Sequence, residues 1–130
     1  MVCRRVPDDA WQARRVDRDE ARAACAAKRG AVETYPFGED TAVYKVGGKM
    51  FALVPHSADP AHVSLKCDPD WSDLLREAYA AVGPGYHLNK KHWNTIVLDG
   101  TVPDDELAEL IEHSYMLVVD ALPQRVRAAL

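Results

Sequence analysis

The amino-acid sequence predicts one α+β domain, with a largely antiparallel β-sheet covered by helices on one face. Three observations support this fold class. The chain of 130 residues is long enough for one hydrophobic core and too short for two. The pair Gly47-Gly48 separates two runs rich in aromatic and β-branched residues, which is the pattern of a β-hairpin. Segments with helical spacing of apolar residues flank the predicted strands, and the connections are short.

The first predicted element is a helix that starts at Asp17. Asp17 and Glu20 stand at the spacing of a capping box, in which the aspartate accepts from a first-turn amide and the glutamate reaches back. Gly30 can adopt the left-handed conformation that ends a helix. We therefore expect this helix to run to about Arg29.

Three strands are expected next, the first two of them joined as a hairpin. The hairpin strands are predicted at 41–46 and 49–54, because a diglycine tolerates the positive φ angles of a type I′ turn. A third strand is predicted at 62–67, where apolar and polar side chains alternate. The alternation places Val63, Leu65 and Cys67 inward and His62, Ser64 and Lys66 outward. The sheet is thus expected to have one solvated face or edge.

A second helix is predicted to begin at Asp68-Pro69, since aspartate caps free amides and proline suits the first helical position. Its helical spacing continues to the dipeptide Gly83-Pro84, which is expected to end it. The apolar stripe comprises Trp71, Leu74, Leu75, Ala78, Tyr79 and Val82. Leu74→Ala is accordingly expected to cost about 2–5 kcal/mol, as a truncation in the core.

The last two predicted elements are a strand and a long helix. The strand covers 94–98 and is closed by Asp99-Gly100. The helix begins near Pro103-Asp104 and continues to about Leu122. Its buried stripe is expected to contain Leu107, Leu110, Ile111, Ser114, Val118 and Ala121, widened by Leu117 and Val119.

Composition places the chain among ordinary globular proteins, with 48% hydrophobic and 28% charged residues. Neither membrane insertion nor secretion is predicted, because no apolar stretch approaches the roughly 18 residues of a membrane span.

The three cysteines, Cys3, Cys25 and Cys67, have no close spacing and are interpreted as free thiols of a reducing compartment, so a cytoplasmic protein is expected. Residues 1–16 lack an apolar period and are treated as an N-terminal extension to a domain at 17–130.

Charge is unevenly distributed along the chain, whose formal net charge is −4. Residues 1–30 hold eight Lys and Arg against five Asp and Glu, whereas residues 99–120 hold seven acidic residues and no Lys or Arg. The simplest interpretation of the second segment is a solvated acidic helix.

Motifs for catalysis, cofactors and metals are missing from the sequence. The diglycine at 47–48 is followed by a strand, so it does not form a phosphate-binding loop. The pair His113-Ser114 lies inside a predicted helix, where adjacent side chains point apart. Neither His87 nor His92 is accompanied by a second spaced carboxylate or a cysteine pair. We expect a protein without enzymatic activity, cofactor or bound metal.

One distinctive segment, from Pro84 to Ile96, is predicted to lie at the surface and to bind nucleic acid. Its lysines can neutralise phosphates, its asparagines can bond to backbone or base edges, and its aromatic rings can stack on a base. The candidate residues are Tyr86, His87, Asn89, Lys90, Lys91, His92 and Trp93, supported by Lys45, Lys49 and Lys66 on neighbouring strands. The alternative interpretation is that Asn89 forms a turn, Trp93 anchors the loop in the core and the lysines keep it solvated.

Several motifs occur in the order that is typical of one known family. They are Tyr35-Pro36-Phe37-Gly38, Lys45 to Leu53, Leu65 to Pro69, Pro84 to Thr95, Ser114-Tyr115 and Leu122-Pro123. Over about residues 17–127 the sequence resembles the MmcQ/YjbR-like family. The resemblance implies a CyaY-like (frataxin-like) α+β fold, a double-wing type of DNA binding and no established enzyme activity.

Two alternatives to DNA binding remain from the sequence. The first is a protein-interaction or small-ligand-binding module that uses the loop at 84–95, and the second is an enzyme that combines His87, His92 and Asn94. The expected partner is DNA, with a protein partner as the alternative and no membrane. The expected assembly is a monomer or a weak homodimer. The frataxin-like comparison also raises iron binding by acidic helix residues, but solvation explains those carboxylates.

Overall fold

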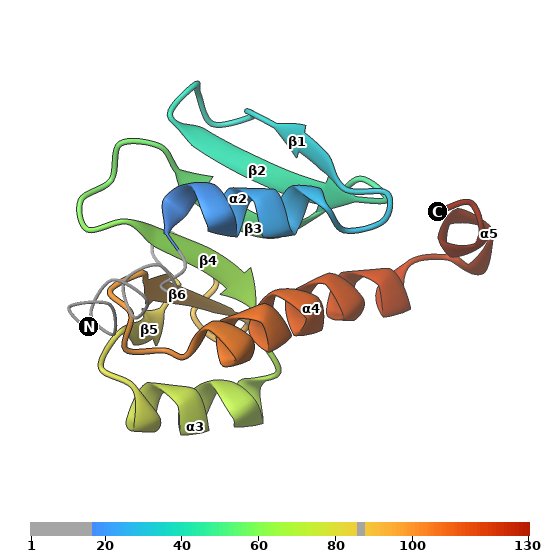
Figure 1. Ribbon diagram of the computed structural model, residues 1–130. Helices are drawn as coiled ribbons and strands as arrows, with labels where there is room; N and C mark the ends of the chain where they lie inside the picture. The colour runs from blue at the N-terminus through green and yellow to red at the C-terminus, as the bar shows by residue number, and fades with distance from the viewer. Residues whose placement is uncertain (1–16, 86–87) are drawn as a thin grey trace, which may run out of the picture.

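A six-stranded antiparallel sheet dominates the computed structural model, which describes residues 17–85 and 88–130 (Figure 1). In chain order the strands are β1 (Val32–Thr34), β2 (Thr41–Val46), β3 (Lys49–Pro55), β4 (His62–Lys66), β5 (Val82–Pro84) and β6 (Trp93–Val97). Their spatial order is β1-β2-β3-β4-β6-β5, and every neighbouring pair is antiparallel. The predicted fold class is confirmed by this topology.

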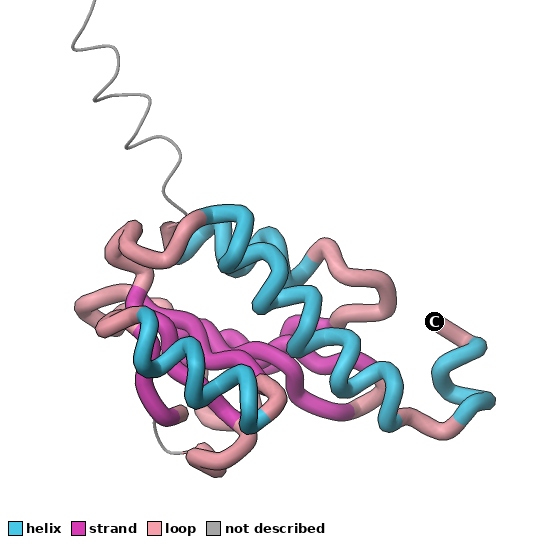
Figure 2. The backbone as a smooth tube through the Cα atoms, turned by 90° about the horizontal axis from the view of Figure 1, so that it is seen from below, coloured by secondary structure: helices cyan, strands magenta, loops and turns pink. Residues whose placement is uncertain are grey.

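Three helices cover one face of the sheet, and among the described residues no helix covers the other face (Figures 1 and 2). They are α2 (Arg18–Ala26), α3 (Pro69–Ala78) and α4 (Asp104–Ala121), and the short α5 (Gln124–Ala128) follows beyond the end of α4. The main core lies between these helices and the sheet, with Tyr44, Phe51 and Ile96 almost completely buried. Within the described residues, no helix is both long and apolar enough to cross a membrane.

The capping box at the start of α2 is confirmed. The Asp17 carboxylate accepts from the Glu20 amide at 2.8 Å, and the Glu20 carboxylate accepts from the Asp17 amide at 3.4 Å. The helix ends at Ala26, slightly before the predicted Arg29, because the chain tightens there: the Lys28 amide donates to the Cys25 carbonyl three residues back.

The predicted hairpin is also confirmed. Gly47 and Gly48 have φ angles of 58° and 82°, as a type I′ turn requires at both central positions. The strand register shifts between Tyr44 and Lys45, so that Lys45 pairs with Met50. The extra residue is in β3, because β2 keeps its alternation, and it places Met50 on the same side of the sheet as Lys45.

The second predicted helix is shorter than expected. α3 ends at Ala78, and Tyr79 is already extended, with φ −130° and ψ 121°. The predicted terminator Gly83-Pro84 instead belongs to β5, whose Val82 pairs with Ile96 of β6. Proline is tolerated there because β5 is an edge strand, where the missing amide is not needed for a ladder bond.

Leu74 was assigned to the buried stripe of this helix, and that prediction is wrong. Its side chain is 65% exposed, whereas the neighbouring Leu75 is 3% exposed and packs in the core. Successive residues on a helix are rotated by roughly 100°, so two adjacent leucines cannot both point at the sheet. The cost of 2–5 kcal/mol expected above for Leu74→Ala therefore does not apply.

The last helix, α4, matches its prediction at both ends, and most of its stripe is buried. The exceptions are Leu117, which is 36% exposed, and Ala121, which is exposed. These two residues are four positions apart and therefore share one side of the helix, which faces away from the core. Ser114 is fully buried and joins two strands: its hydroxyl accepts from the Lys66 amide at 2.9 Å and donates to the Phe51 carbonyl at 2.5 Å.

Candidate nucleic-acid interface

The face of the sheet opposite the helices, called the open face below, carries a second, small hydrophobic cluster. Val43, Leu53 and Trp93 are its buried members, and Met50 and Leu88 pack against it. Because side chains alternate along a strand, the cluster identifies which positions share this face. On β2, β3, β4 and β6 they are Thr41, Val43, Lys45, Met50, Leu53, Pro55, His62, Ser64, Lys66, Trp93 and Thr95.

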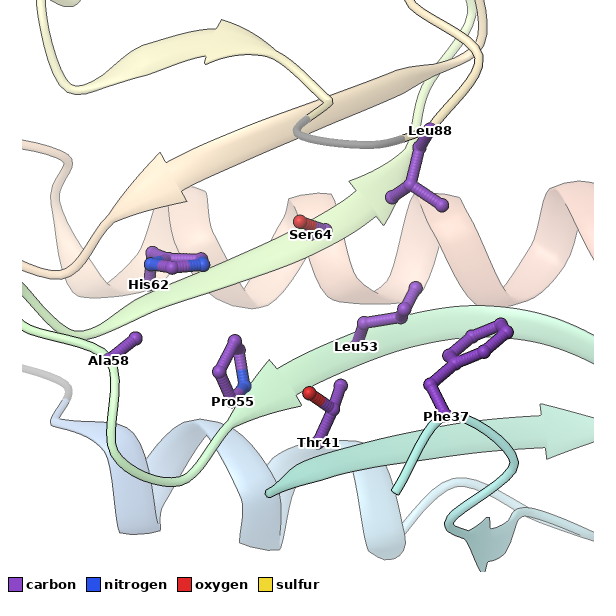
Figure 3. Close-up of a pocket in the computed structure, with 8 residues that line it drawn as sticks. All are labelled: Phe37, Thr41, Leu53, Pro55, Ala58, His62, Ser64 and Leu88. Carbon is purple, nitrogen blue, oxygen red and sulfur yellow. The ribbon is translucent and has the colours of Figure 1, made fainter. Parts of the chain in front are cut away.

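A pocket of about 390 Å³ opens on this face, and Figure 3 shows the side chains that line it. The strands contribute Thr41, Leu53, Pro55, His62 and Ser64, and the connecting loops contribute Phe37, Ala58 and Leu88. Figure 3 places Phe37, Leu53 and Leu88 toward one end and Ala58 and His62 toward the other.

The pocket is mainly apolar, but its β4 wall carries polar atoms. The hydroxyls of Ser64 and Thr95 lie 2.9 Å apart across the β4–β6 pairing. The Nδ1 atom of His62 lies 3.2 Å from the Pro60 carbonyl. A neutral ring that donates from Nδ1 has a lone pair available at Nε2.

Trp93, which the sequence offers for base stacking, is 5% exposed. Its ring lies in the open-face cluster, and the Lys66 ammonium stands 5.9 Å from the ring centroid. That geometry is a cation–π contact. Burial therefore favours the alternative interpretation, in which Trp93 anchors the loop in the core.

The loop before β6 presents its polar side chains to solvent, with Lys90, Lys91 and His92 all exposed. Asn89 builds the turn: its side-chain oxygen accepts from the Lys91 amide at 2.9 Å, and its carbonyl accepts from the amides of His92 and Trp93. Asn89 thus acts as an ordinary turn former, while the two lysines stay free of ion pairs among the described residues.

Arg76 of α3 holds this loop from the helical side, a role that the sequence analysis missed. Its guanidinium donates to the carbonyls of Lys90 at 2.6 Å and Trp93 at 3.3 Å, and to the side-chain oxygen of Asn94 at 2.9 Å. Asn94 is buried and donates in turn to the Ser72 hydroxyl at 3.1 Å. Asn94 therefore lies on the covered face of the sheet, where it joins α3 to β6.

The structure divides the supporting lysines between the two faces. Lys45 pairs with Met50 and Lys66 contacts Trp93, so both belong to the open face. Lys49 pairs with Val46, a residue of the main core, and residues directly opposite in an antiparallel pair share a face. Lys49 is therefore on the other side of the hairpin. Two further candidates, Tyr86 and His87, lie outside the described residues.

Carboxylates are absent from the open-face positions defined above. The chain has 20 acidic residues against 16 Lys and Arg, and many of its carboxylates lie on the helical side. The acidic residues of α3 and α4 are Asp70, Asp73, Glu77, Asp104, Asp105, Glu106, Glu109, Glu112 and Asp120. The net negative charge of the chain thus conceals a sheet face whose charged groups are cationic.

The two described thiols are neutral, and the described residues form no cluster of metal ligands. Burial raises the pKa of the Cys25 thiol to about 12 and also raises the pKa of Cys67, so both thiols are held neutral. Both are buried, as an inert cysteine would be. Cys3 lies outside the described residues. No group of three or more His, Cys, Asp or Glu within residues 17–85 and 88–130 is placed to hold a metal ion.

Comparison with known proteins identifies the family. The model of the YjbR family matches residues 26–117, which include all six strands and most of α4. The chain belongs to the YjbR family. The uncharacterized protein YjbR of Escherichia coli K12 is 38% identical over 106 residues, which cover 82% of this chain and 90% of that protein. The uncharacterized protein YbdF of Escherichia coli O157:H7 is 39% identical over 105 residues, covering 76% and 86%.

Solved structures extend the YjbR family comparison to three dimensions. A crystal structure of a Deinococcus radiodurans protein superposes with a TM-score of 0.83 at 41% identity and covers 88% of both chains. A crystal structure from Pseudomonas syringae gives a TM-score of 0.66 at 27% identity, over 78% of this chain and 98% of that chain. The match to the YjbR family thus includes every strand that contributes to the open face.

Proposed function

We propose that this protein binds nucleic acid, with DNA as the first candidate, through the open face and the adjoining loop at 88–92. Under this proposal the protein acts by binding and not by catalysis. The observation that carries it is the charge of the open face. In a chain of net charge −4, the outward strand positions include Lys45 and Lys66 and no carboxylate. A cationic face is unexpected on a protein of net negative charge. Binding of a polyanion such as nucleic acid accounts for it.

The loop at 88–92 adds exposed cations to the same face. Leu88 reaches into the open-face pocket, and Lys90 and Lys91 follow it within three residues. The hydrogen bonds from Arg76 to this loop and the turn at Asn89 hold the backbone that carries both lysines. Such a fixed loop is suited to contacting phosphates beside the sheet.

Charge reversal in the loop tests this proposal. Lys90→Glu/Lys91→Glu should weaken DNA binding and reduce the slope of log K against log salt by about one unit per lost contact. Fluorescence anisotropy with labelled DNA at roughly 50 and 200 mM salt measures both quantities. Thermal stability should stay nearly constant, because exposed charges contribute little to folding.

The matched control is Arg125→Glu/Arg127→Glu, which makes the same change of charge at two exposed positions of α5. This control should retain most of the wild-type affinity. Equal losses in the two double variants would show that only the net charge matters, and unchanged binding in the lysine variant would remove the loop from the interface.

The pocket gives a second candidate function a specific basis, namely binding of a small apolar ligand. Its volume of about 390 Å³ and its lining by Phe37, Leu53 and Leu88 lie within the range of ligand sites. The two candidates differ in salt dependence: phosphate-driven affinity falls steeply as salt rises, whereas apolar binding changes little.

A further inference from the structure

The pocket beside Phe37 combines apolar walls with an exposed aromatic ring. Phe37 is 65% exposed and stands at the rim, while Leu53 and Leu88 form the adjoining wall. An exposed ring that continues into an apolar pocket forms a contiguous apolar surface of the kind that binds ligands, and a flat aromatic ligand is the partner that this ring fits best.

The strands that line the pocket supply hydrogen-bonding groups. The Ser64 hydroxyl lines the pocket, and the Nε2 atom of His62 retains a lone pair when Nδ1 donates to Pro60. Thr41 adds a second hydroxyl to the lining. Apolar walls with a few polar atoms on one side match a nucleobase, which has two π-faces and a polar edge.

Two segments that line this pocket also carry lysines. Leu88 lines the pocket, and the exposed Lys90 and Lys91 lie on the same loop. Lys66 follows the pocket residue Ser64 on the same face of β4. None of the described lining residues carries a carboxylate. Glu39, Asp40 and Asp59 stand beside the lining residues Phe37, Thr41 and Ala58, so the groups that suit an anionic backbone are the lysines of the Leu88 loop and Lys66.

From this arrangement we propose that the pocket receives one unstacked base of a single-stranded nucleic acid, an inference that rests on the proposed function. Phe37 stacks on the base, the β4 wall meets its polar edge, and the lysines contact the phosphates on either side. A base inside a duplex is stacked on both faces and paired at its edge, so it cannot enter the pocket without leaving the helix. The protein should therefore bind single strands more tightly than duplexes.

Phe37→Ala is the test variant, and Leu74→Ala is its matched control because both side chains are 65% exposed. The probes are a mixed-sequence DNA strand of about 12 nucleotides, its duplex, and a strand of equal length built from abasic sites. Binding is measured by fluorescence anisotropy. Wild type should bind the normal strand more tightly than the other two, and Phe37→Ala should lose roughly 5- to 100-fold on the normal strand, as expected for one lost stacking contact.

The abasic strand separates this inference from the proposed function, because it keeps the phosphates and lacks the bases. Phe37→Ala should bind it as wild type does, while Lys90→Glu/Lys91→Glu should bind it more weakly.

If Phe37→Ala matches wild type on the normal strand, or if the duplex binds as tightly as the single strand, the base-binding inference is wrong while phosphate binding stands. If no strand binds, both proposals fail. An apolar dye that occupies the pocket and resists displacement by the normal strand would instead identify an apolar ligand site.

Discussion

The Arg76 guanidinium donates from Nε to the side-chain oxygen of Asn94, 2.9 Å away, which joins α3 to β6, and from Nη2 to the Lys90 carbonyl in the loop between β5 and β6. Asn94 is 1% exposed, and its amide nitrogen donates to Ser72. Both the oxygen and the nitrogen of the Asn94 side chain thus have hydrogen-bond partners inside the protein. The loop that carries Lys90 and Lys91 is therefore held by a buried amide on the far side of the sheet.

Removal of that amide should destabilise the fold. Asn94→Ala leaves the Arg76 Nε and the Ser72 hydroxyl without their partner, at a cost of about 1–3 kcal/mol in the free energy of unfolding. Urea denaturation measures this loss. Asn89→Ala is the control, since Asn89 is exposed and makes one side-chain bond within its own turn; its cost should stay under about 1 kcal/mol. Similar costs for both variants would contradict the role assigned to Asn94.

Two adjacent leucines of α3 provide a second comparison. Leu75→Ala should lose about 2–5 kcal/mol of unfolding free energy, because it leaves a cavity in the main core. Leu74→Ala should change it by about 0.5 kcal/mol or less, because that side chain is largely in solvent. Equilibrium denaturation of the two variants shows which leucine of α3 faces the sheet. A larger loss of unfolding free energy for Leu74→Ala than for Leu75→Ala would show that Leu74 faces it.

The β2–β3 turn supports a third prediction. A Cβ atom on Gly47 would lie 2.6 Å from the Leu122 side chain, whereas one on Gly48 would meet nothing within 4 Å. Both residues have positive φ, so each alanine variant should lose about 1–2 kcal/mol from backbone strain. Gly47→Ala should lose a further 1–3 kcal/mol or so, because Leu122 is buried and has little room to turn away. Equal melting temperatures for the two variants would rule out the contact with Leu122.

The free energy of unfolding should decrease as the pH falls, because His113 becomes protonated. Its Nε2 accepts from the Asp68 amide at 3.1 Å, which requires the neutral ring, and burial lowers its pKa below the ordinary 6.5 despite the nearby Asp68 carboxylate. The unfolded chain therefore takes up the proton first, so this contribution to stability is complete above pH 6.5 and is lost as the pH falls toward the folded pKa. His113→Gln keeps an acceptor that does not titrate.

Thermal melting at neutral pH and at about pH 5 tests this linkage, since an unperturbed histidine titrates between those values. The melting temperature of the wild type should decrease more over this pH interval than that of His113→Gln. Identical losses in the two proteins would show that His113 does not contribute to the pH dependence.

The features that could be predicted from the sequence depend on neighbours in the chain. The capping box of Asp17 and Glu20 and the turn at Gly47-Gly48 are determined by residues within a few positions of one another, and both are confirmed. The features that were missed depend on distant partners. The sequence pattern around Val82 is compatible with a helix or a strand. Its pairing with Ile96 makes it part of a strand.

The same distinction applies to the candidate site. The exposed lysines and the turn at Asn89 were recognisable from the loop sequence alone. The pocket was not, because Phe37, Leu53 and Leu88 come from three separate segments that only the folded sheet brings together. Arg76 likewise reaches a residue 18 positions away. Its only local signal was a basic side chain in the last turn of a helix, which is common for other reasons.

The sheet ends at β1 on one side and at β5 on the other, and each of these strands has three residues. Each therefore exposes a row of unpaired backbone groups only about 10 Å long, at a rise of roughly 3.4 Å per residue. Pro84 removes one donor from the β5 row. Such short borders give another chain little to pair with, so the fold is protected against edge-to-edge fibre growth even though its sheet is not closed.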